Sequence, residues 1–290
     1  MKTGVIIKGI GGFYYVDIEG TIFECRARGK FRIENITPLV GDRVDIEINE
    51  ESKQGYVLNI HPRKNEMKRP AIANIDQVIM VFAAKSPDIN MTLLQKFLIY
   101  AEHVGLNIIV CINKIDLDEN QDYRAVVEML RSIPYGVIET STKKLIGIDE
   151  LKTALKDKIT VFAGPSGAGK SSLLNLVQLG LQLKTGDLSK KIDRGTHTTR
   201  HSELIKLEIG GLVADTPGFT SLEFNNIDAG KLKQLFPEFG KYSDCRFSDC
   251  HHNKEPQCGV KEAVLEGKIS KLRYEYYISL LEEFKDIRRY

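Results

Sequence analysis

GPSGAGKS at residues 164–171 is the stretch of sequence that decides the fold. It satisfies the pattern G-x-x-x-x-G-K-[ST] between a strand-like run, ITVFA, and a helix-like run, which is the setting that a phosphate-binding loop requires. Glycines let successive backbone N–H groups face an anion at the positive end of the helix. In such a loop Lys170 reaches the β- and γ-phosphates and acts in catalysis, while Ser171 holds Mg²⁺. The residues predicted to contact the nucleotide here are Gly164, Pro165, Ser166, Gly167, Ala168, Gly169, Lys170, Ser171 and Ser172.

A second motif, NKID at residues 113–116, precedes the phosphate loop. A carboxylate two residues after a lysine can accept hydrogen bonds from the ring N–H and the amino group of guanine, a donor pair that adenine lacks. Asp116 is therefore the predicted guanine reader. Asn113 is predicted to brace the neighbouring loops, and the Lys114 stem and Ile115 to line the base. The alternative is a solvated turn, but the motif follows a buried strand, at the edge where α/β sheets bind ligands.

Two further loops complete the predicted guanine-nucleotide site. STKKLIGIDEL begins at residue 141, after the next strand, and Ser141 or Thr142 is expected to offer a backbone N–H to the guanine O6. DTPG at 215–218 fits the pattern D-x-x-G, which places Asp215 near Mg²⁺ through water and Gly218 near the γ-phosphate. The same pattern in DIEG near the start of the chain is dismissed, because it lies far from any phosphate loop.

The motifs follow one another in an unusual order: the base reader and second base loop come first, and the phosphate loop and switch loops follow. Around them, apolar runs of buried-strand length alternate with helix-like runs, as in a parallel sheet covered on both faces. Joining the old chain ends and cutting elsewhere preserves such a sheet and its ligand-binding edge. We therefore predict a circularly permuted α/β P-loop GTPase domain at residues 64–224.

Residues 1–63 contain five short strand-like pieces separated by glycine, proline and charged turns. This pattern predicts a small all-β barrel of the oligonucleotide-binding (OB) type, although such barrels also serve as plain structural appendages. Basic runs combined with this barrel favour RNA contact, while each run alone is typical of a solvated face. The basic residues are Arg26, Arg28, Lys30 and Arg32; Arg63, Lys64, Lys68 and Arg69; and Lys184, Lys190, Lys191, Arg194 and Arg200. The candidates for stacking on bases, which are alternatively core residues, are Tyr14, Tyr15 and Phe31.

Three of the five cysteines, Cys245, Cys250 and Cys258, lie close together near His251 and His252. Three thiolates and one imidazole make a closed tetrahedral zinc site, which fixes a fold rather than catalysing a reaction. We predict one structural zinc ion per chain in a small helical subdomain at residues 225–290. The isolated Cys25 and Cys111 are predicted to be buried, unreactive thiols.

The bulk composition fits an ordinary globular protein. The chain has 290 residues, 42% of them hydrophobic, and a formal net charge of +2, so a role in nucleic-acid binding has to come from local patches. Its apolar runs are too short to span a membrane, and the N-terminus lacks the features of a signal peptide. We expect a cytoplasmic, monomeric protein with no membrane partner.

A barrel, a permuted GTPase and a C-terminal Cys–His cluster, with RGTHTTR at 194–200, together resemble the bacterial ribosome-small-subunit-dependent GTPase A family. The resemblance covers essentially the whole chain. It implies hydrolysis of GTP to GDP and phosphate, stimulated by the small ribosomal subunit, contact with its rRNA, and a role in its late maturation. It also favours His252 over His251 as the fourth zinc ligand. Similar proteins tend to have a threonine in place of Arg200, which leaves the roles of the neighbouring threonines open.

The catalytic step needs a group that orients water. Ras-like GTPases use a glutamine just after D-x-x-G, but that place is occupied here by Phe219, which can neither accept nor donate a proton. His197, in the loop predicted to be the first switch, is the candidate within the chain; the alternative is a surface histidine. Thr198 or Thr199 is predicted to bind Mg²⁺ and to sense the γ-phosphate.

Two other functions are compatible with parts of this pattern. A P-loop kinase for a small metabolite would prefer adenine and would need an acceptor pocket, and the NKID motif counts against it. An RNA-binding module that uses the nucleotide structurally would show no turnover even with its partner, and Phe219 is consistent with it. Measuring GTP turnover with and without small ribosomal subunits distinguishes these functions from the leading one.

Overall fold

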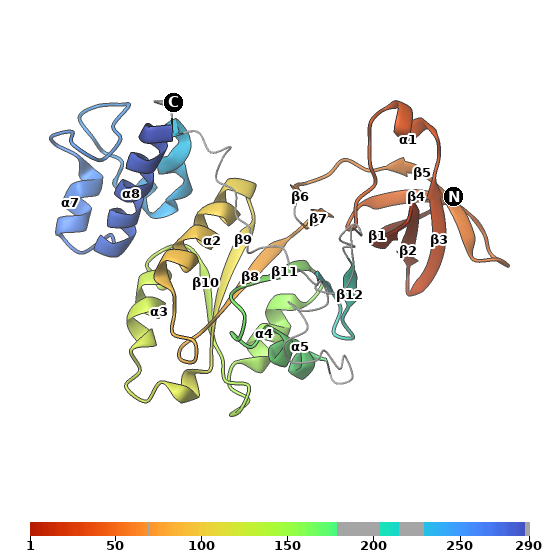
Figure 1. Cartoon of the computed structure of the whole chain (residues 1–290), viewed down its shortest axis with the longest axis horizontal. Helices are drawn as coiled ribbons and strands as arrows, with labels where there is room; N and C mark the ends of the chain where they lie inside the picture. Colours follow the sequence, from red (N-terminus) through yellow and green to blue (C-terminus); the bar gives the residue numbers. More distant parts are fainter. Residues whose placement is uncertain (69, 179–202, 215–228, 288–290) are drawn as a thin grey trace.

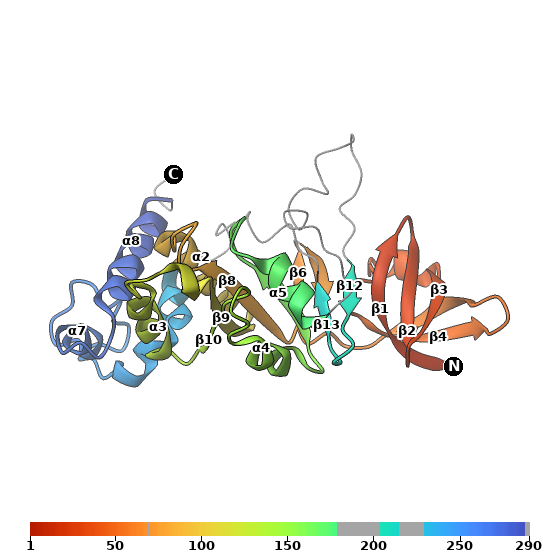
Figure 2. The same ribbon diagram turned by 90° about the horizontal axis from the view of Figure 1, so that it is seen from below.

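The computed structural model describes residues 1–68, 70–178, 203–214 and 229–287. Three parts follow one another along the chain: a β-barrel, a six-stranded sheet covered by helices, and a group of helices at the C-terminus (Figure 1). Turned by 90°, the three parts lie in a row, with the sheet in the middle (Figure 2). Among the helices in the described part of the chain, none offers the long apolar stretch that a membrane crossing demands.

The N-terminal barrel closes in the strand order β1-β2-β3-β5-β4. Every neighbouring pair in it is antiparallel except β3 and β5, which run parallel. A one-turn helix, α1, lies between β3 and β4, and neither this turn nor the parallel pair was predicted. The elements are β1 (Lys2–Ile10), β2 (Phe13–Ile18), β3 (Thr21–Ala27), α1 (Lys30–Ile33), β4 (Arg43–Asn49) and β5 (Gln54–Ile60).

The alternation of side chains along the strands decides which aromatic residues of the barrel face outward. Val16 is fully buried, so Tyr14, two residues earlier, shares the inward face of β2 and packs against the core. Phe31 is only 4% exposed and also belongs to the core. Of the two alternatives for Tyr14 and Phe31, the structure agrees with the core position. Tyr15 faces outward, where its hydroxyl donates to Glu24 Oε2 at 3.1 Å.

The segment that leaves the barrel is fixed to it by a buried ion pair. Arg63 donates from Nε and Nη2 to the two oxygens of Asp42, at 2.8 and 2.9 Å, and Asp42 is fully buried. Lys64 pairs with Asp76 at 3.0 Å. These two members of the predicted RNA-binding run thus have partners within the chain. The short hairpin of β6 (Glu66–Lys68) and β7 (Ala71–Ala73) leads on to the central sheet.

The central sheet has the strand order β10-β9-β8-β11-β13-β12, and every pair is parallel except the last, because β12 runs antiparallel to β13. β8 is buried along its whole length, as its continuous apolar sequence predicts. The strands are β8 (Gln77–Ala83), β9 (Asn107–Asn113), β10 (Gly136–Glu139), β11 (Ile159–Ala163), β12 (Leu204–Lys206) and β13 (Leu212–Ala214).

Helices cover both faces of this sheet. α2 (Met91–Val104) and α3 (Tyr123–Arg131) pack on one face, and α4 (Ile148–Leu155) and α5 (Lys170–Val177) on the other. α2 begins at Asn90, whose side chain accepts a hydrogen bond from the Leu93 N–H. It ends at Gly105, whose φ of +72° lies in the left-handed region that commonly ends helices.

The C-terminal part consists of short helices around an aromatic core. Phe236, Phe239 and Tyr277 meet with ring centroids 5.1 Å apart. Arg273 is fully buried; it donates to Glu238 Oε1 at 2.7 Å and to Gln95 Oε1 of α2 at 2.6 Å. Because an unpaired buried guanidinium is costly, this arginine ties the C-terminal part to the central domain. The helices are η2 (Ala229–Leu235), η3 (Pro237–Tyr242), α7 (Gly259–Leu265) and α8 (Lys271–Ile287).

Candidate functional site

The carboxyl ends of β8, β9, β10 and β11 lie along one edge of the central sheet, since these strands are parallel neighbours. The loops that follow them carry the motifs singled out in the sequence: NKID after β9, the loop from Ser141 after β10, and the phosphate loop after β11. An edge of this kind is where α/β sheets bind ligands.

The phosphate loop needs its glycines for steric reasons. Gly164 has φ +133°, and a Cβ there would lie 2.1 Å from the Val81 carbonyl oxygen. Gly169 has φ +97°, and a Cβ there would lie 2.2 Å from the Asn113 amide nitrogen. The loop therefore packs its backbone against β8 and against the base-reading motif, at distances that only glycine allows. Ser166 and Gly167 at its tip are exposed to solvent.

Lys170 and Ser171 open helix α5, directly after Gly169. The Lys170 ammonium donates to the carbonyl oxygens of Gly164 and Pro165, at 2.7 and 2.8 Å, so it lies across the concave side of the loop. Burial lowers the pKa of Lys170 to about 8. Ser171 is buried at 7% exposure in the first turn of α5, and Ser172 beside it is half-buried.

Asn113 joins the base reader to the phosphate loop. Its side-chain amide donates to the Ala168 carbonyl oxygen at 2.9 Å and accepts from the Thr140 hydroxyl at 3.1 Å. Asn113 and Thr140 are both fully buried, so these hydrogen bonds are not exchanged for water. The sequence predicted the brace at Asn113 but missed Thr140, whose signal is a polar residue at the carboxyl end of an apolar strand.

Asp116 is oriented by Ser141. The Ser141 hydroxyl donates to Asp116 Oδ1 at 2.6 Å and accepts from the Lys144 N–H at 3.0 Å. The Ser141 backbone N–H donates to the Ile146 carbonyl at 3.1 Å. Since that N–H is engaged, Thr142 remains as the candidate of the predicted pair for the guanine O6, and Ser141 positions the carboxylate instead.

A further wall of the site is made by the loop after β8, which the sequence did not single out. Lys114 has φ +58°, and its ammonium donates to the Ser86 carbonyl. Pro87 lies beside the phosphate loop, where a Cβ on Gly167 would meet its ring at 3.5 Å. Ile115 is half-buried, and its N–H donates to the Thr140 carbonyl at 3.3 Å. The Lys114 side chain is thus held at its ammonium by Ser86, and its backbone is held through the hydrogen bond of the next residue, Ile115.

The remaining predicted catalytic residues fall outside the described part of the chain. These are His197, Thr198, Thr199, Asp215 and Gly218. The strand that leads to DTPG is described: β13 ends at Ala214, which pairs in parallel with Val161 of the strand that leads to the phosphate loop. The chain therefore leaves β13 at the same sheet edge as the phosphate loop.

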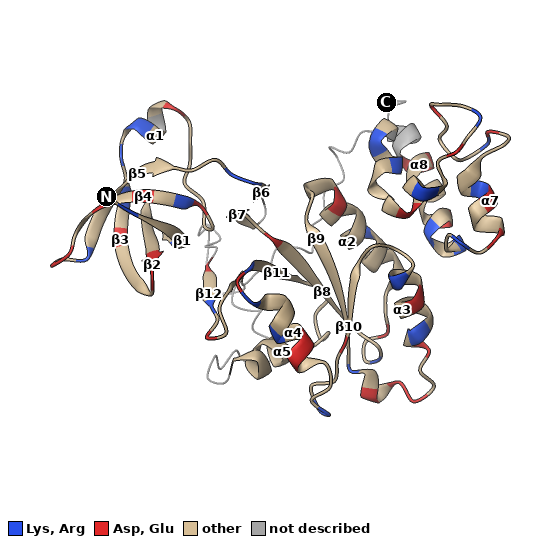
Figure 3. Cartoon of the chain, turned by 180° about the vertical axis from the view of Figure 1, so that it is seen from behind, with Lys and Arg blue, Asp and Glu red and all other residues tan. Residues whose placement is uncertain are grey.

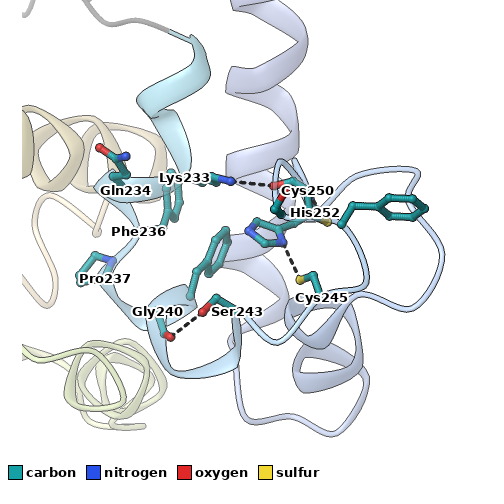
Figure 4. Close-up of a pocket in the computed structure, with 12 residues that line it drawn as sticks. Lys233, Gln234, Phe236, Pro237, Gly240, Ser243, Cys245, Cys250 and His252 are labelled. Atoms are coloured by element: carbon teal, nitrogen blue, oxygen red, sulfur yellow. Dashed lines mark hydrogen bonds between the residues drawn. The ribbon is translucent and has the colours of Figure 1, made fainter.

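The C-terminal part contains one cluster of metal-ligand side chains among the described residues: Cys245, Cys250, His252 and Cys258, whose ligand atoms all lie within 4.8 Å of one another. The sulfurs of Cys245 and Cys258 are 3.8 Å apart, and Cys245 Sγ lies 3.6 Å from His252 Nδ1 (Figure 4). Two thiolates bound tetrahedrally at about 2.3 Å from a metal ion are themselves about 3.8 Å apart. The donor set and its spacing fit one tetrahedral ion.

The surroundings of the cluster hold its ligands in place. His252 is 4% exposed, whereas the N–H of the more exposed His251 donates to Glu255 at 2.9 Å. The Tyr274 hydroxyl donates to the His252 carbonyl at 2.7 Å. Burial, with a further contribution from Cys245, raises the pKa of Cys258 to about 12, so a thiolate here needs a cation beside it. A pocket of about 240 Å³, with Phe236 and Pro237 on its wall, opens beside the cluster (Figure 4).

Comparisons with known proteins cover the whole chain. Family models described as the RsgA N-terminal domain and the RsgA GTPase match residues 3–57 and 60–225. A protein of Caldanaerobacter subterraneus subsp. tengcongensis, named small ribosomal subunit biogenesis GTPase RsgA, is 50% identical over 98% of this chain and 96% of its own length. A protein of the same name from Clostridium perfringens is 51% identical over 97% of each chain.

Solved structures agree with the fold. The crystal structure of YjeQ from Thermotoga maritima matches 97% of each chain with a TM-score of 0.85 and 42% identity. YloQ, described as a circularly permuted GTPase, matches 99% of this chain and 96% of its own with a TM-score of 0.83 and 41% identity. The predicted fold class, with its permuted motif order, and the predicted enzyme class are confirmed: the chain is a circularly permuted GTPase and belongs to the RsgA GTPase family.

Proposed function

We propose that this GTPase acts on the small ribosomal subunit during its late maturation and hydrolyses GTP when it is docked there. The proposal is supported by the full-length relatives, which are named small ribosomal subunit biogenesis GTPases. The observation that carries it in the structure is the hydrogen bonding of the NKID motif, where Ser141 holds Asp116 and Asn113 holds the phosphate loop. The protein would work in the cytoplasm as a monomer, with no membrane partner.

The roles of the side chains follow from their positions. Asp116, held by Ser141, accepts from the guanine N–H groups, and Lys170 turns from the loop carbonyls to the β- and γ-phosphates. Ser171 and one of Thr198 and Thr199 would hold Mg²⁺, which neutralises phosphate charge when it is bound. Since Phe219 cannot orient water, we assign that task to His197, with Asp215 acting near Mg²⁺ through water and Gly218 near the γ-phosphate.

The docking step should depend on the nucleotide and on salt. The basic residues Lys190, Lys191 and Arg194 lie in the predicted first switch and would meet rRNA phosphates. We expect the GTP-bound protein to co-sediment with small subunits at least tenfold more tightly than the GDP-bound protein, because hydrolysis releases a GTPase switch. Equal binding in the two states, or binding that is insensitive to salt, would contradict the proposal.

The nucleotide affinity should fall in alkaline solution. Pairing with phosphate requires a protonated Lys170, whose pKa in the nucleotide-free protein is lowered to about 8 by burial. Below this pH the ammonium is already present and affinity should be flat. Above it, binding must take up a proton, so GTP affinity should drop toward tenfold per pH unit. Calorimetry at pH 9 in buffers of different ionisation enthalpy measures this uptake, and its absence would contradict the role of Lys170.

We assign the Cys₃His cluster to one structural zinc ion per chain, because three sulfurs and an imidazole nitrogen at tetrahedral spacing are the donors that zinc prefers. Replacing Cys250 by serine should lower bound zinc at least tenfold and open residues 240–290 to proteolysis, since this part has a small core of its own. Cys25→Ser, at a buried thiol in the barrel, is the matched control and should keep zinc. A zinc-free protein with a protease-resistant C-terminal part would refute the assignment.

A further inference from the structure

Cys245 and Cys258 lie opposite each other in the C-terminal part, on two antiparallel stretches of chain that form a β-bridge. The backbone hydrogen bonds run between their neighbours, from the Arg246 N–H to the Gln257 carbonyl at 3.1 Å and from the Gly259 N–H to the Asp244 carbonyl at 3.2 Å. These bonds flank the two cysteines and do not join them. In an antiparallel pair of this kind the Cα atoms are about 4.5 Å apart and the side chains lie close together.

This backbone pairing suits a disulfide bond. Cysteines joined by a disulfide have their Cα atoms about 4.4–6.8 Å apart, so the bridge already meets this requirement. The two sulfurs are 3.8 Å apart, and rotation of the side chains can close that distance while the backbone stays in place. Cys250, the third thiol of the cluster, lies outside the bridge, and its sulfur accepts a hydrogen bond from the His252 N–H at 3.4 Å. Cys245 and Cys258 are therefore the pair that can join with the least movement.

A small reagent can reach the cluster through the pocket beside it. Cys245 and Cys250 both line this pocket of about 240 Å³ (Figure 4). Cys245 is half-buried, whereas Cys250 and Cys258 are 2% and 1% exposed. Basic and acidic residues are mixed over the helices of the C-terminal part (Figure 3), so no single sign of charge selects a charged reagent. Cys245 is thus the thiol of the cluster that a small neutral oxidant meets first.

We infer that hydrogen peroxide oxidises Cys245 and Cys258 to a reversible disulfide and that the cluster then releases its metal ion, an inference that rests on the zinc assignment made above. Metal-bound thiols are deprotonated, and the thiolate is the form that peroxide oxidises. Cys245 Sγ attacks one peroxide oxygen, the O–O bond breaks, and a sulfenic acid and a hydroxide ion form. The Cys258 thiolate then attacks the Cys245 sulfur and displaces a second hydroxide. The two sulfurs lose two electrons, and the peroxide gains them.

The disulfide removes two of the four ligands. Cys250 and His252 remain, and we expect them to hold zinc about a thousandfold or more weakly than the complete set. The His252 ring packs edge-on against Phe239, with centroids 5.8 Å apart, and its carbonyl accepts from the Tyr274 hydroxyl of α8. The loop that carries His252 is therefore part of the small C-terminal core, and oxidation should loosen that core.

The test is treatment of the zinc-loaded, full-length protein with hydrogen peroxide in the presence of a chromogenic zinc chelator. Peroxide should release zinc about tenfold or more faster than buffer alone, and mass spectrometry of the non-reduced peptides should find Cys245 linked to Cys258. Residues 240–290 should become sensitive to protease. Dithiothreitol with added zinc should restore resistance, because a disulfide is reducible and a sulfinic acid is not.

The matched control is Cys25→Ser, which removes a fully buried thiol of the barrel. This variant should release zinc as the wild type does, and Cys111, also fully buried, should stay unmodified in both proteins. Retention of zinc under peroxide would overturn the inference. So would release of zinc with Cys250 in the disulfide, or with irreversible oxidation and no disulfide.

Two outcomes separate this inference from the zinc assignment. If the purified protein holds no zinc and peroxide still links Cys245 to Cys258, the zinc assignment fails and the disulfide pair is confirmed. If the protein holds zinc and peroxide produces no bond between these two cysteines, the zinc assignment stands and the inference is wrong.

Discussion

Replacing Asp116 by asparagine should lower GTP affinity about a hundredfold and create affinity for XTP. The carboxylate accepts from two guanine donors, and an amide at this position would turn a donor toward them and leave one unpaired. Xanthine carries a carbonyl where guanine carries its amino group, and that carbonyl suits an amide donor. In the structure Asp116 is half-buried and held by Ser141 at 2.6 Å, so the side chain cannot turn away without losing that bond.

The measurement compares the GTP and XTP affinities of the wild type and Asp116→Asn by competition with a fluorescent guanine nucleotide. Asp122→Asn removes an exposed carboxylate at the start of α3 and serves as the control. Ser141→Ala should weaken GTP binding by less, about tenfold, because it loosens the carboxylate without removing it. Unchanged GTP affinity in Asp116→Asn would take the NKID motif out of the site.

Replacing His197 by alanine should cut subunit-stimulated GTP turnover by about a hundredfold or more while leaving GTP-dependent docking largely intact. The reason is chemical: Phe219 occupies the place of the usual water-positioning glutamine, and a positioned histidine is the group in the predicted switch that can orient the attacking water. The variant should therefore lose turnover but keep docking, since the histidine acts on the attacking water and the basic residues contact the RNA.

Phosphate release in the presence of saturating small subunits measures the effect, paired with co-sedimentation in the GTP-bound state. His103→Ala, at an exposed histidine in the last turn of α2, is the control and should behave as the wild type. If His197→Ala retains wild-type stimulated turnover, the group that orients water comes from the backbone or from the ribosome.

The sequence predicted those parts of the site that short patterns define. The phosphate loop, NKID and the Cys₃His set are local, and their order along the chain was enough to predict the permuted sheet. The partners of these residues were not predictable in the same way. Thr140 reaches Asn113 from the next strand, and Ser86 reaches Lys114 from the loop after β8. Such contacts depend on which strands are neighbours, and no spacing in the sequence records that.

Charges and aromatic residues were harder to place than motifs. Arg63 was predicted to contact RNA but closes on the buried Asp42, and Arg273, which drew no attention in the sequence, ties α8 to α2. Tyr14 and Tyr15 are adjacent on β2, so their side chains point to opposite faces: Tyr14 packs against the core and Tyr15 faces outward. The contact of Arg26 with the Phe13 ring was missed for the same reason: the two residues become neighbours only once the strand register is known.

Family membership excludes the kinase alternative, because the relatives that match over the whole chain are GTPases.

The central claim is that the small ribosomal subunit stimulates GTP hydrolysis by this protein. GTP turnover of the full-length protein, measured with and without purified small ribosomal subunits, tests it directly, with large subunits as the matched control. Turnover should be slow alone and with large subunits, and should rise at least tenfold with small subunits. Equal turnover in all three conditions would contradict the account.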